Sequence, residues 1–441
     1  MKQIINPPPS KWESLLARPS ASYDALEPIV AKVFTAIESR GDTAIREFTE
    51  EFDKVKLTDF KVSAESLAAA EDEVSAALKG AIQQAKNNIS CFHTAQKTDR
   101  VFVETMKGVA CWQEKRPIEK VGLYIPGGSA PLFSTLLMLA VPAKIAGCSE
   151  IVLCTPPDQK GEIPAVIRYT ASLCGISQLY AVGGIQAIAA MTLGTESIPQ
   201  VYKIFGPGNQ YVTVAKQWAT RLNVSIDMPA GPSELLVVAD DSADPDFIAS
   251  DLLSQAEHGP DSQVIFVTTV IEMLDKVASA VKAQLEVLPR KAIAEKALAN
   301  SKMIYFSEEE HAIRYINAYG PEHYIVCVKN EDRYVSGIQN AGSVFIGNYT
   351  PESAGDYASG TNHTLPTNGY SKQYSGVNLD SFLKAITFQK ISKEGIQTLG
   401  KTIELMAAAE GLEAHKNAVR IRLNKIADEN LVAWRDKLKQ Y

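Results

Sequence analysis

From about residue 120 onwards the chain alternates short apolar runs with stretches of helical character, and this alternation limits the possible folds more than any other feature. The apolar runs are typical of buried strands and cover 120–125, 150–154, 178–182, 201–205 and 234–239. Helices are expected to begin between them, near Ser134, Pro164, Ile185 and Asn209. Because such alternation builds βαβ units, the pattern predicts an α/β fold with a parallel sheet.

A second set of the same kind follows. Its strands are expected over 234–239, 263–269, 324–328 and 343–347, with helices from Pro245 and over 271–288. Two α/β domains are therefore predicted. The chain is mostly helical before residue 110 and again after about residue 393. Between these parts, 351–376 is a long, polar, glycine-rich stretch of the kind that forms functional or mobile loops.

Bulk composition narrows the class of protein. With 441 residues, 46% hydrophobic and 22% charged, the chain suits a globular protein with two or more cores. Its six cysteines form no CxxC pair, so reduced thiols in a reducing compartment are expected. We recognise no signal peptide or membrane-spanning run, and a net charge of −7 argues against nucleic acid or an anionic membrane as partner. The expected location is the cytoplasm.

Glycines follow several expected strands, in YIPGGSAP, VGGIQ and FGPGN. They permit close approach of a phosphate to the backbone at the strand ends, where an open α/β sheet binds its ligands. Turn geometry alone would select the same residues, and both interpretations stay open. The chain contains no GxGxxG and no GxxxxGK[ST] motif, so a dinucleotide cannot be inferred from a fingerprint.

Six histidines are available for ligation or proton transfer. His93 and His311 stand in charged helical surroundings and are expected to face solvent. The other four each stand beside a polar residue near a predicted break, and they are His258, His323, His363 and His415. Together with Asp356 in the polar stretch they contain what a divalent metal site needs, although no pair has the HExxH spacing.

The segment SQAEHGP around residue 257 allows two interpretations. Asp244 and Pro245 are suited to start a helix, and Gly259-Pro260 is suited to end it. One face of this helix would be apolar, with Phe247, Ile248, Leu252 and Leu253. A polar helix end is one interpretation. In the other, Gln255 and His258 lie three residues apart on one helix face and hold a cation together.

Glu322 and His323 are consecutive, directly after Gly320-Pro321. Neighbours in an extended strand point to opposite faces, so both can serve one pocket only if the Gly-Pro break bends the chain. A neutral histidine is a suitable base at cellular pH, whereas a glutamate needs burial to hold a proton usefully. The alternative is a pair at a strand start that faces solvent.

Nine motifs, taken in order, are similar to those of the histidinol dehydrogenase family, the enzymes of the last steps of histidine biosynthesis. They are SRGDTAIREFTEEFD, VGLYIPGGSAPLFSTLLMLAVPAKIAGC, GGIQAIAAMTLGTESIP, KIFGPGNQYV, DMPAGPSE, SDLLSQAEHGPDSQV, YGPEH, AGSVFIGNYTPESAGDYASGTNHTLPT and AEGLEAHKNAV. The resemblance covers nearly the whole chain. It implies two incomplete Rossmann-like domains without the GxGxxG motif, small helical N- and C-terminal domains, and an intertwined homodimer.

The resemblance also implies a role for each matched residue. One Zn²⁺ per subunit would be bound by Gln255, His258, Asp356 and His415. Proton transfer would be carried out by Glu322 and His323. NAD⁺ would contact Tyr124, Gln186 and Asn209. The substrate would contact Ser233, His363 and Glu410, together with His323 and the four zinc ligands.

The implied division of the chain is a small N-terminal segment over 1–23, a first α/β domain over 24–123 and 234–377, an inserted NAD-binding α/β domain over 124–233, and a C-terminal helical tail over 378–441. The first α/β domain would carry the metal and catalytic residues. The tail, with Glu410 and His415, would complete the active site of the partner subunit.

The implied reaction is the zinc-dependent oxidation of L-histidinol through L-histidinaldehyde to L-histidine, with reduction of two NAD⁺. A glutamine ligand is unusual for zinc, and we hypothesise that manganese or cobalt can substitute. Two alternatives remain: a paralogous NAD- and zinc-dependent dehydrogenase of another small alcohol, such as a sulfonated diol, and a non-catalytic metal- or nucleotide-binding protein on the same scaffold.

Overall fold

A computed structural model describes residues 1–19, 25–127, 131–229 and 231–438. The chain divides into two compact units. The first comprises Met1–Lys97 and Ile118–Phe382, and the second comprises Thr98–Pro117 and Leu383–Tyr441. The boundary predicted between residues 23 and 24 lies outside the described residues.

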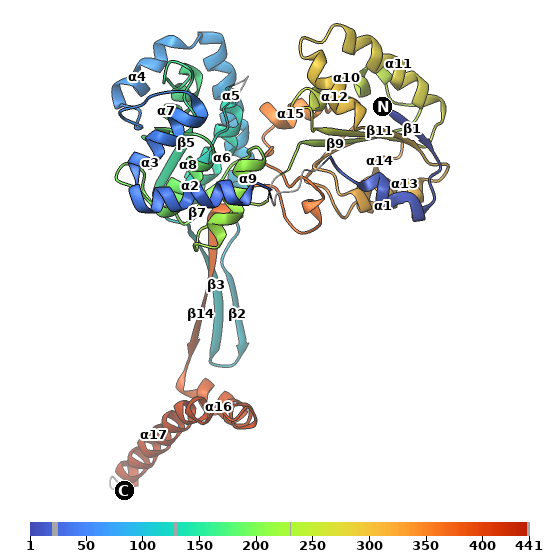
Figure 1. Ribbon diagram of the computed structural model, residues 1–441. Coiled ribbons are helices and arrows are strands. Elements are labelled where there is room, and N and C mark those ends of the chain that lie inside the picture. The colour runs from blue at the N-terminus through green and yellow to red at the C-terminus, as the bar shows by residue number, and fades with distance from the viewer. Residues whose placement is uncertain (20–24, 128–130, 230, 439–441) are drawn as a thin grey trace. The chain divides into compact units, whose positions relative to one another are not determined.

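A five-stranded parallel sheet in the first unit confirms the first βαβ prediction. Its order is β6-β5-β4-β7-β8, with β4 at Lys120–Tyr124, β5 at Glu150–Thr155, β6 at Gln178–Ala181, β7 at Lys203–Phe205 and β8 at Ser225–Ile226. The connecting helices are α6 (Phe133–Ala146), α7 (Ala165–Leu173), α8 (Gly184–Leu193) and α9 (Gln210–Thr220). Figure 1 shows these helices around the strands. Apolar strands buried between helices explain the near-continuous hydrophobic runs.

The N-terminal helices pack against this five-stranded sheet. They are α2 (Glu27–Arg40), α3 (Asp42–Phe48), α4 (Ala64–Glu73) and α5 (Ala76–Ala95). Their apolar side chains belong to the two hydrophobic cores that contain residues of β4 and β5. Phe34 lies in one core with Ile188, and Ile89 lies in the other with Leu137. The predicted division instead grouped residues 24–123 with 234–377. Helix patterning shows which face is apolar but not which sheet covers it, and this explains the difference.

A six-stranded parallel sheet forms the other core of the first unit, in the order β1-β11-β10-β9-β12-β13. The strands are β1 (Lys2–Ile5), β9 (Glu234–Ala239), β10 (Gln263–Thr268), β11 (Lys302–Tyr305), β12 (His323–Cys327) and β13 (Ser343–Ile346). Helices α10 (Pro245–Ala256), α11 (Glu272–Glu286) and α12 (Lys291–Ala299) contribute to one core, and α13 (Glu309–Tyr319) to another. The expected strands are confirmed. Two strands were not predicted, β11 and β1, and β1 pairs with β11 at the sheet edge.

The second unit contains a three-stranded antiparallel sheet that was not predicted. Strand β3 (Val109–Pro117) lies between β2 (Val101–Met106) and β14 (Leu383–Ile391), and the three form a long ribbon (Figure 1). Two helices follow, α16 (Lys393–Ala409) and α17 (Glu413–Leu438). The C-terminal part expected to be helical therefore begins with a strand, whose partners lie more than 260 residues earlier.

Helix α10 confirms most of the local prediction. Asp244 caps it by accepting a hydrogen bond from the backbone N–H of Asp246, and Ile248, Leu252 and Leu253 are buried. Phe247, expected in the apolar stripe, is 40% exposed. The polar stretch 351–376 is not a plain loop, because it contains α15 (Glu352–Tyr357). Among the residues described, we find no helix both long enough and apolar enough to cross a membrane.

Candidate active site

Glu322 and His323 lie where β12 begins, and both are buried. The expected bend before them is present, since Gly320 has a φ of 63°. Glu322 Oε2 accepts a hydrogen bond from the backbone N–H of Glu234 at 2.8 Å, and His323 Nδ1 lies 3.2 Å from the Glu234 carbonyl oxygen. A carbonyl can only accept, so Nδ1 carries the proton and Nε2 is the basic nitrogen. The alternative of a solvent-facing pair is wrong.

Carboxylates surround the imidazole of His323. Glu352 Oε1 and Glu322 Oε2 lie 3.5 and 3.7 Å from Nδ1, and Asp356 Oδ1 lies 3.5 Å from Nε2. Burial alone would lower the pKa of His323, but these carboxylates raise it well above its ordinary value. Burial raises the pKa of Glu322 to about 8. A carboxyl group in this range can take up and release a proton near neutral pH.

Gln255 and His258 come together at the end of α10, as their spacing predicts. Gln255 Nε2 lies 3.1 Å from His258 Nδ1, and the Gln255 side chain is buried. Its Oε1 atom has no hydrogen-bond partner within the described part of the chain. A buried carbonyl oxygen left unpaired is costly unless a ligand satisfies it. Oxygen and imidazole donors side by side fit a divalent cation.

Glu352 was not predicted as a candidate site residue, but it lies beside His323. It is 1% exposed, and neither carboxylate oxygen has a hydrogen-bond partner among the residues described. Ligand atoms of His323, Glu352 and Asp356 all lie within 4.8 Å of one another, a donor set that could hold a cation. One signal was available, because Glu352 and Asp356 stand four apart on α15 and so share a helix face.

His363 is fixed at both ring nitrogens. Nδ1 lies 2.7 Å from the carbonyl oxygen of Asp356, and Nε2 lies 3.0 Å from Oγ1 of Thr135. The preceding residue, Asn362, donates to the carbonyl of Met138 and approaches Nε2 of His93. His93 is fully buried, so the expectation that it faces solvent is wrong. It packs inward because its Nδ1 bonds to the carbonyl of Ile89 one turn earlier in α5.

A cavity of about 230 Å³ brings together five of the predicted residues. Those in its lining are Asn209, Ser233, His258, Glu322 and His363. The glycine loop at residues 206–208 lines the same cavity. Residues from both parallel sheets of the first unit therefore meet around one space, which is large enough for a small polar molecule.

A buried ion pair fixes this glycine loop. Lys216 Nζ lies 2.5 Å from Asp227 Oδ1 and donates to the carbonyl of Gly206 at 2.8 Å. Asp227 Oδ2 accepts from the Gly206 N–H, also at 2.8 Å. Gly206 has a φ of 136°, and a Cβ there would lie 2.1 Å from the carbonyl oxygen of Tyr124. Only glycine fits where this loop passes the end of β4.

Tyr124 is the last residue of β4, and Gln186 lies in the first turn of α8, after β6; neither lines that cavity. The Tyr124 hydroxyl accepts from the N–H of Gly184 at 3.1 Å, at the start of α8. Gln186 Nε2 donates to Asp53 Oδ2 at 3.0 Å, and both Tyr124 and Gln186 are buried. Their position at the carboxyl edge of the five-stranded sheet agrees with the general location of nucleotide sites. Their contact with a cofactor stays a prediction.

Glu410 and His415 belong to the second unit. Glu410 follows the last turn of α16, His415 lies in the first turn of α17, and both are exposed. Their predicted role depends on a partner subunit and stays a proposal.

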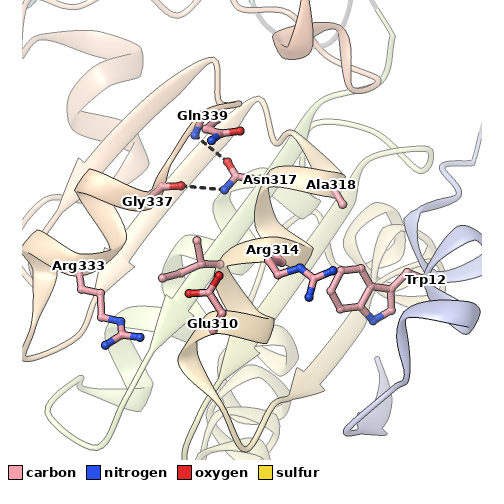
Figure 2. A pocket seen from close by; sticks show the side chains of 9 residues that line it. Trp12, Glu310, Arg314, Asn317, Ala318, Arg333, Gly337 and Gln339 are labelled. Atoms are coloured by element: carbon pink, nitrogen blue, oxygen red, sulfur yellow. Dashed lines mark hydrogen bonds between the residues drawn. The ribbon is translucent and has the colours of Figure 1, made fainter.

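A second hollow in the first unit lies beside α13 and is lined by Trp12, Glu310, Ile313, Arg314, Asn317, Ala318, Arg333, Gly337 and Gln339 (Figure 2). Two of its polar side chains, Asn317 and Arg333, are already paired. The Asn317 amide bonds to the carbonyl of Gly337 and the N–H of Gln339, and Arg333 pairs with Glu309 at 2.9 Å. Its lining residues do not include the histidine and glutamate side chains that converge on the cavity lined by His258, Glu322 and His363.

Asp251, on α10, leads to a prediction about stability. Burial raises the pKa of its carboxyl group to about 7, against about 3.9 in an unfolded chain. Between about pH 4 and 7 the folded protein therefore holds a proton that the unfolded chain has lost, so stability falls as pH rises through this window. Asp251→Asn has no carboxyl group to ionise, so this variant should not lose stability as the pH rises. We expect a gain on the order of 4 kcal/mol at pH 8 and a smaller gain at pH 5.

Thermal unfolding at the two pH values measures this effect. Asp246→Asn on the same helix is the control, because Asp246 is exposed and its substitution should shift Tm equally at both values. An equal shift for Asp251→Asn at pH 5 and pH 8 would contradict the prediction.

These side chains define an α/β enzyme with a buried acid–base pair next to residues suited to bind a cation. The histidinol dehydrogenase family model matches residues 16–423. Curated relatives named histidinol dehydrogenase include one from Bacteroides fragilis (strain YCH46), 56% identical over 97% of this chain and 100% of its own, and one from Escherichia coli O6:H1, 54% identical over 94% and 95%. The crystal structure of histidinol dehydrogenase from Elizabethkingia anophelis is 56% identical, covers 97% of this chain and 99% of its own, and superposes with a TM-score of 0.95. The chain belongs to the histidinol dehydrogenase family and is an oxidoreductase.

Proposed function

We propose that this protein oxidises L-histidinol through L-histidinaldehyde to L-histidine, with reduction of two NAD⁺, in the last steps of L-histidine biosynthesis. The names of its relatives support this substrate. The observation that carries the proposal is the buried Glu322–His323 pair, which is fixed by both backbone groups of Glu234. Such a pair suits two successive oxidations with a hydration step between them.

The proton steps follow from the geometry. With the Nδ1 proton held toward the carbonyl of Glu234, His323 in its neutral form accepts the alcohol proton at Nε2 as a hydride leaves the alcohol carbon for NAD⁺. Glu322 then takes a proton from the water that adds to the aldehyde, and the aldehyde oxygen takes up the proton held by His323, which returns His323 to its neutral form. His323 accepts the hydrate proton as the second hydride leaves for a second NAD⁺. A buried site also keeps the aldehyde from escaping into water between the two oxidations.

One Zn²⁺ per subunit would be held by Gln255, His258 and Asp356, with His415 of the partner subunit. The unpaired Oε1 of Gln255 beside His258 supports this donor set. When bound, the ion would supply a template that orients the imidazole and amine of the substrate. Substrate contacts are further proposed for Ser233 and His363, which line the cavity, and for Glu410.

NAD⁺ would contact Tyr124, Gln186 and Asn209. All three lie where β4, β6 and β7 are followed by loops or helix starts, at the carboxyl edge of the five-stranded sheet. This edge is the usual nucleotide-binding position in open α/β sheets.

A homodimer with shared active sites is also proposed. Large apolar side chains are exposed on α16 and α17: Leu405, Met406, Ile421, Leu431, Val432 and Trp434. Apolar side chains left on such helices are suited to a partner subunit. The six cysteines are unpaired, which supports the cytoplasm as the compartment.

An assay of NADH formation with L-histidinol as sole substrate tests the function. We expect two NADH for each histidinol, loss of turnover after chelation, and recovery with zinc. Recovery by zinc but by neither manganese nor cobalt would refute only the hypothesis of metal substitution. A yield of one NADH, or turnover of a sulfonated diol in place of histidinol, would favour a paralogous dehydrogenase, and no turnover of any alcohol would favour a binding protein.

A further inference from the structure

We propose that the ion pair between Arg18 and Glu234 is a positioning device for the Glu322–His323 pair. The two side chains form a bidentate contact, with Arg18 Nε 2.6 Å from Glu234 Oε1 and Nη2 3.0 Å from Oε2. The side chains are 12% and 2% exposed, so solvent screens the pair little. This inference rests on the proton-transfer roles proposed above for Glu322 and His323.

Glu234 is the residue through which the ion pair reaches the catalytic groups. Its backbone N–H donates to Glu322 and its carbonyl holds His323. Its side chain accepts from the N–H of Asn368 at 2.7 Å as well as from Arg18. A shift of the Glu234 backbone would therefore move both catalytic side chains together.

Arg18 also holds the chain segment that leads into β12. Its Nη2 donates to the carbonyl of Tyr319 at 2.8 Å and lies 3.3 Å from the carbonyl oxygen of Gly320. The guanidinium lies over the Tyr319 ring, 3.9 Å from its centroid. One side chain thus connects the start of β9 to the bend that precedes Glu322. A planar guanidinium can make all these contacts at once, whereas a lysine cannot.

The contacts predict a specific loss of turnover. In Arg18→Met, Arg18→Lys and Glu234→Gln we expect kcat to fall about 10- to 100-fold, because small displacements of reacting groups cost this much, while KM for histidinol changes less than about threefold. Arg18→Met/Glu234→Gln removes both charges, so it avoids a buried unpaired ion and should fold even where a single variant does not. The kcat of this double variant should stay low.

Arg168→Met is the matched control. Arg168 pairs with Glu73 at 2.6 Å, and 10% of the Arg168 side chain is exposed. The kcat of Arg168→Met should stay within about twofold of wild type.

A double-mutant cycle separates positioning from general stability. If Arg18 acts through His323, adding Arg18→Met to His323→Asn should lower kcat less than about threefold further, whereas a structural defect would multiply the losses. Folded Arg18 and Glu234 variants that keep wild-type kcat, or full additivity in the cycle, would overturn the proposal. Glu322→Gln and His323→Asn are measured in the same assay. If these two keep wild-type kcat, it is the proposed function that fails.

Discussion

Replacing His323 by asparagine is expected to lower kcat by about 10²- to 10⁴-fold, the range supplied by a positioned general base. Asparagine can still donate to the Glu234 carbonyl, so the backbone contact that holds the side chain survives. What is lost is the basic Nε2, which lies next to Asp356. Steady-state NADH formation from histidinol measures the loss, and thermal unfolding shows whether the variant is folded.

His311→Asn is the control for this substitution. His311 lies on α13, and its side chain is 41% exposed, far more open than that of His323 at 4%. We expect wild-type kcat and KM for it. Comparable turnover in folded His323→Asn and His311→Asn enzymes would exclude His323 as the base and restore the interpretation of a binding protein.

Mixing two inactive variants is expected to restore activity. If His415 of the partner subunit completes each metal site, His258→Ala and His415→Ala are each inactive, but a mixed dimer contains one intact site. Random pairing makes half the dimers mixed, so co-refolding should recover about a quarter of wild-type turnover. NADH formation measures recovery, and sedimentation or light scattering shows that dimers form.

Each variant refolded alone is the control and should stay inactive. Co-refolding His311→Ala with His258→Ala gives a further comparison. Only the His258→Ala subunits carry a defective site in that mixture, so it should have about half of wild-type turnover. If dimers form and the His258→Ala and His415→Ala mixture stays inactive, the sharing of active sites between subunits is unsupported.

Much of the fold could be predicted because its signals are local. Buried strands such as Glu150–Thr155 and Glu234–Ala239 are nearly continuous apolar runs. The start of α10 is signalled by two adjacent residues, the N-cap Asp244 and Pro245. The edge strand Lys2–Ile5 has exposed side chains and no such pattern, so it was missed. The antiparallel ribbon of the second unit was missed for a similar reason, since none of the six residues of β2 is buried.

The candidate site was predicted less evenly. Gln255 and His258 were singled out from their spacing, and the other candidate histidines, Asp356 and Glu322 from their polar surroundings. The family motifs added Tyr124, Gln186, Asn209, Ser233 and Glu410 and assigned the roles. Glu352 was missed because a glutamate beside a helix start is ordinary as a surface residue, and nothing local indicates that it is buried. Glu234 was seen only as the first residue of an apolar strand.

The sequence by itself determined the two sets of alternating strands and helices, the start of α10 and the family to which the chain belongs, because each rests on residues close together or on motifs in a fixed order. Only the tertiary structure decided which residues surround His323. Arg18 and Glu234 stand 216 positions apart, and the backbone of Glu234 meets Glu322 across 88 positions. Contacts over such separations form when strands align in a sheet and leave no periodicity in the chain. The proposed catalytic pair is therefore readable in the sequence, whereas the ion pair proposed to position it is not.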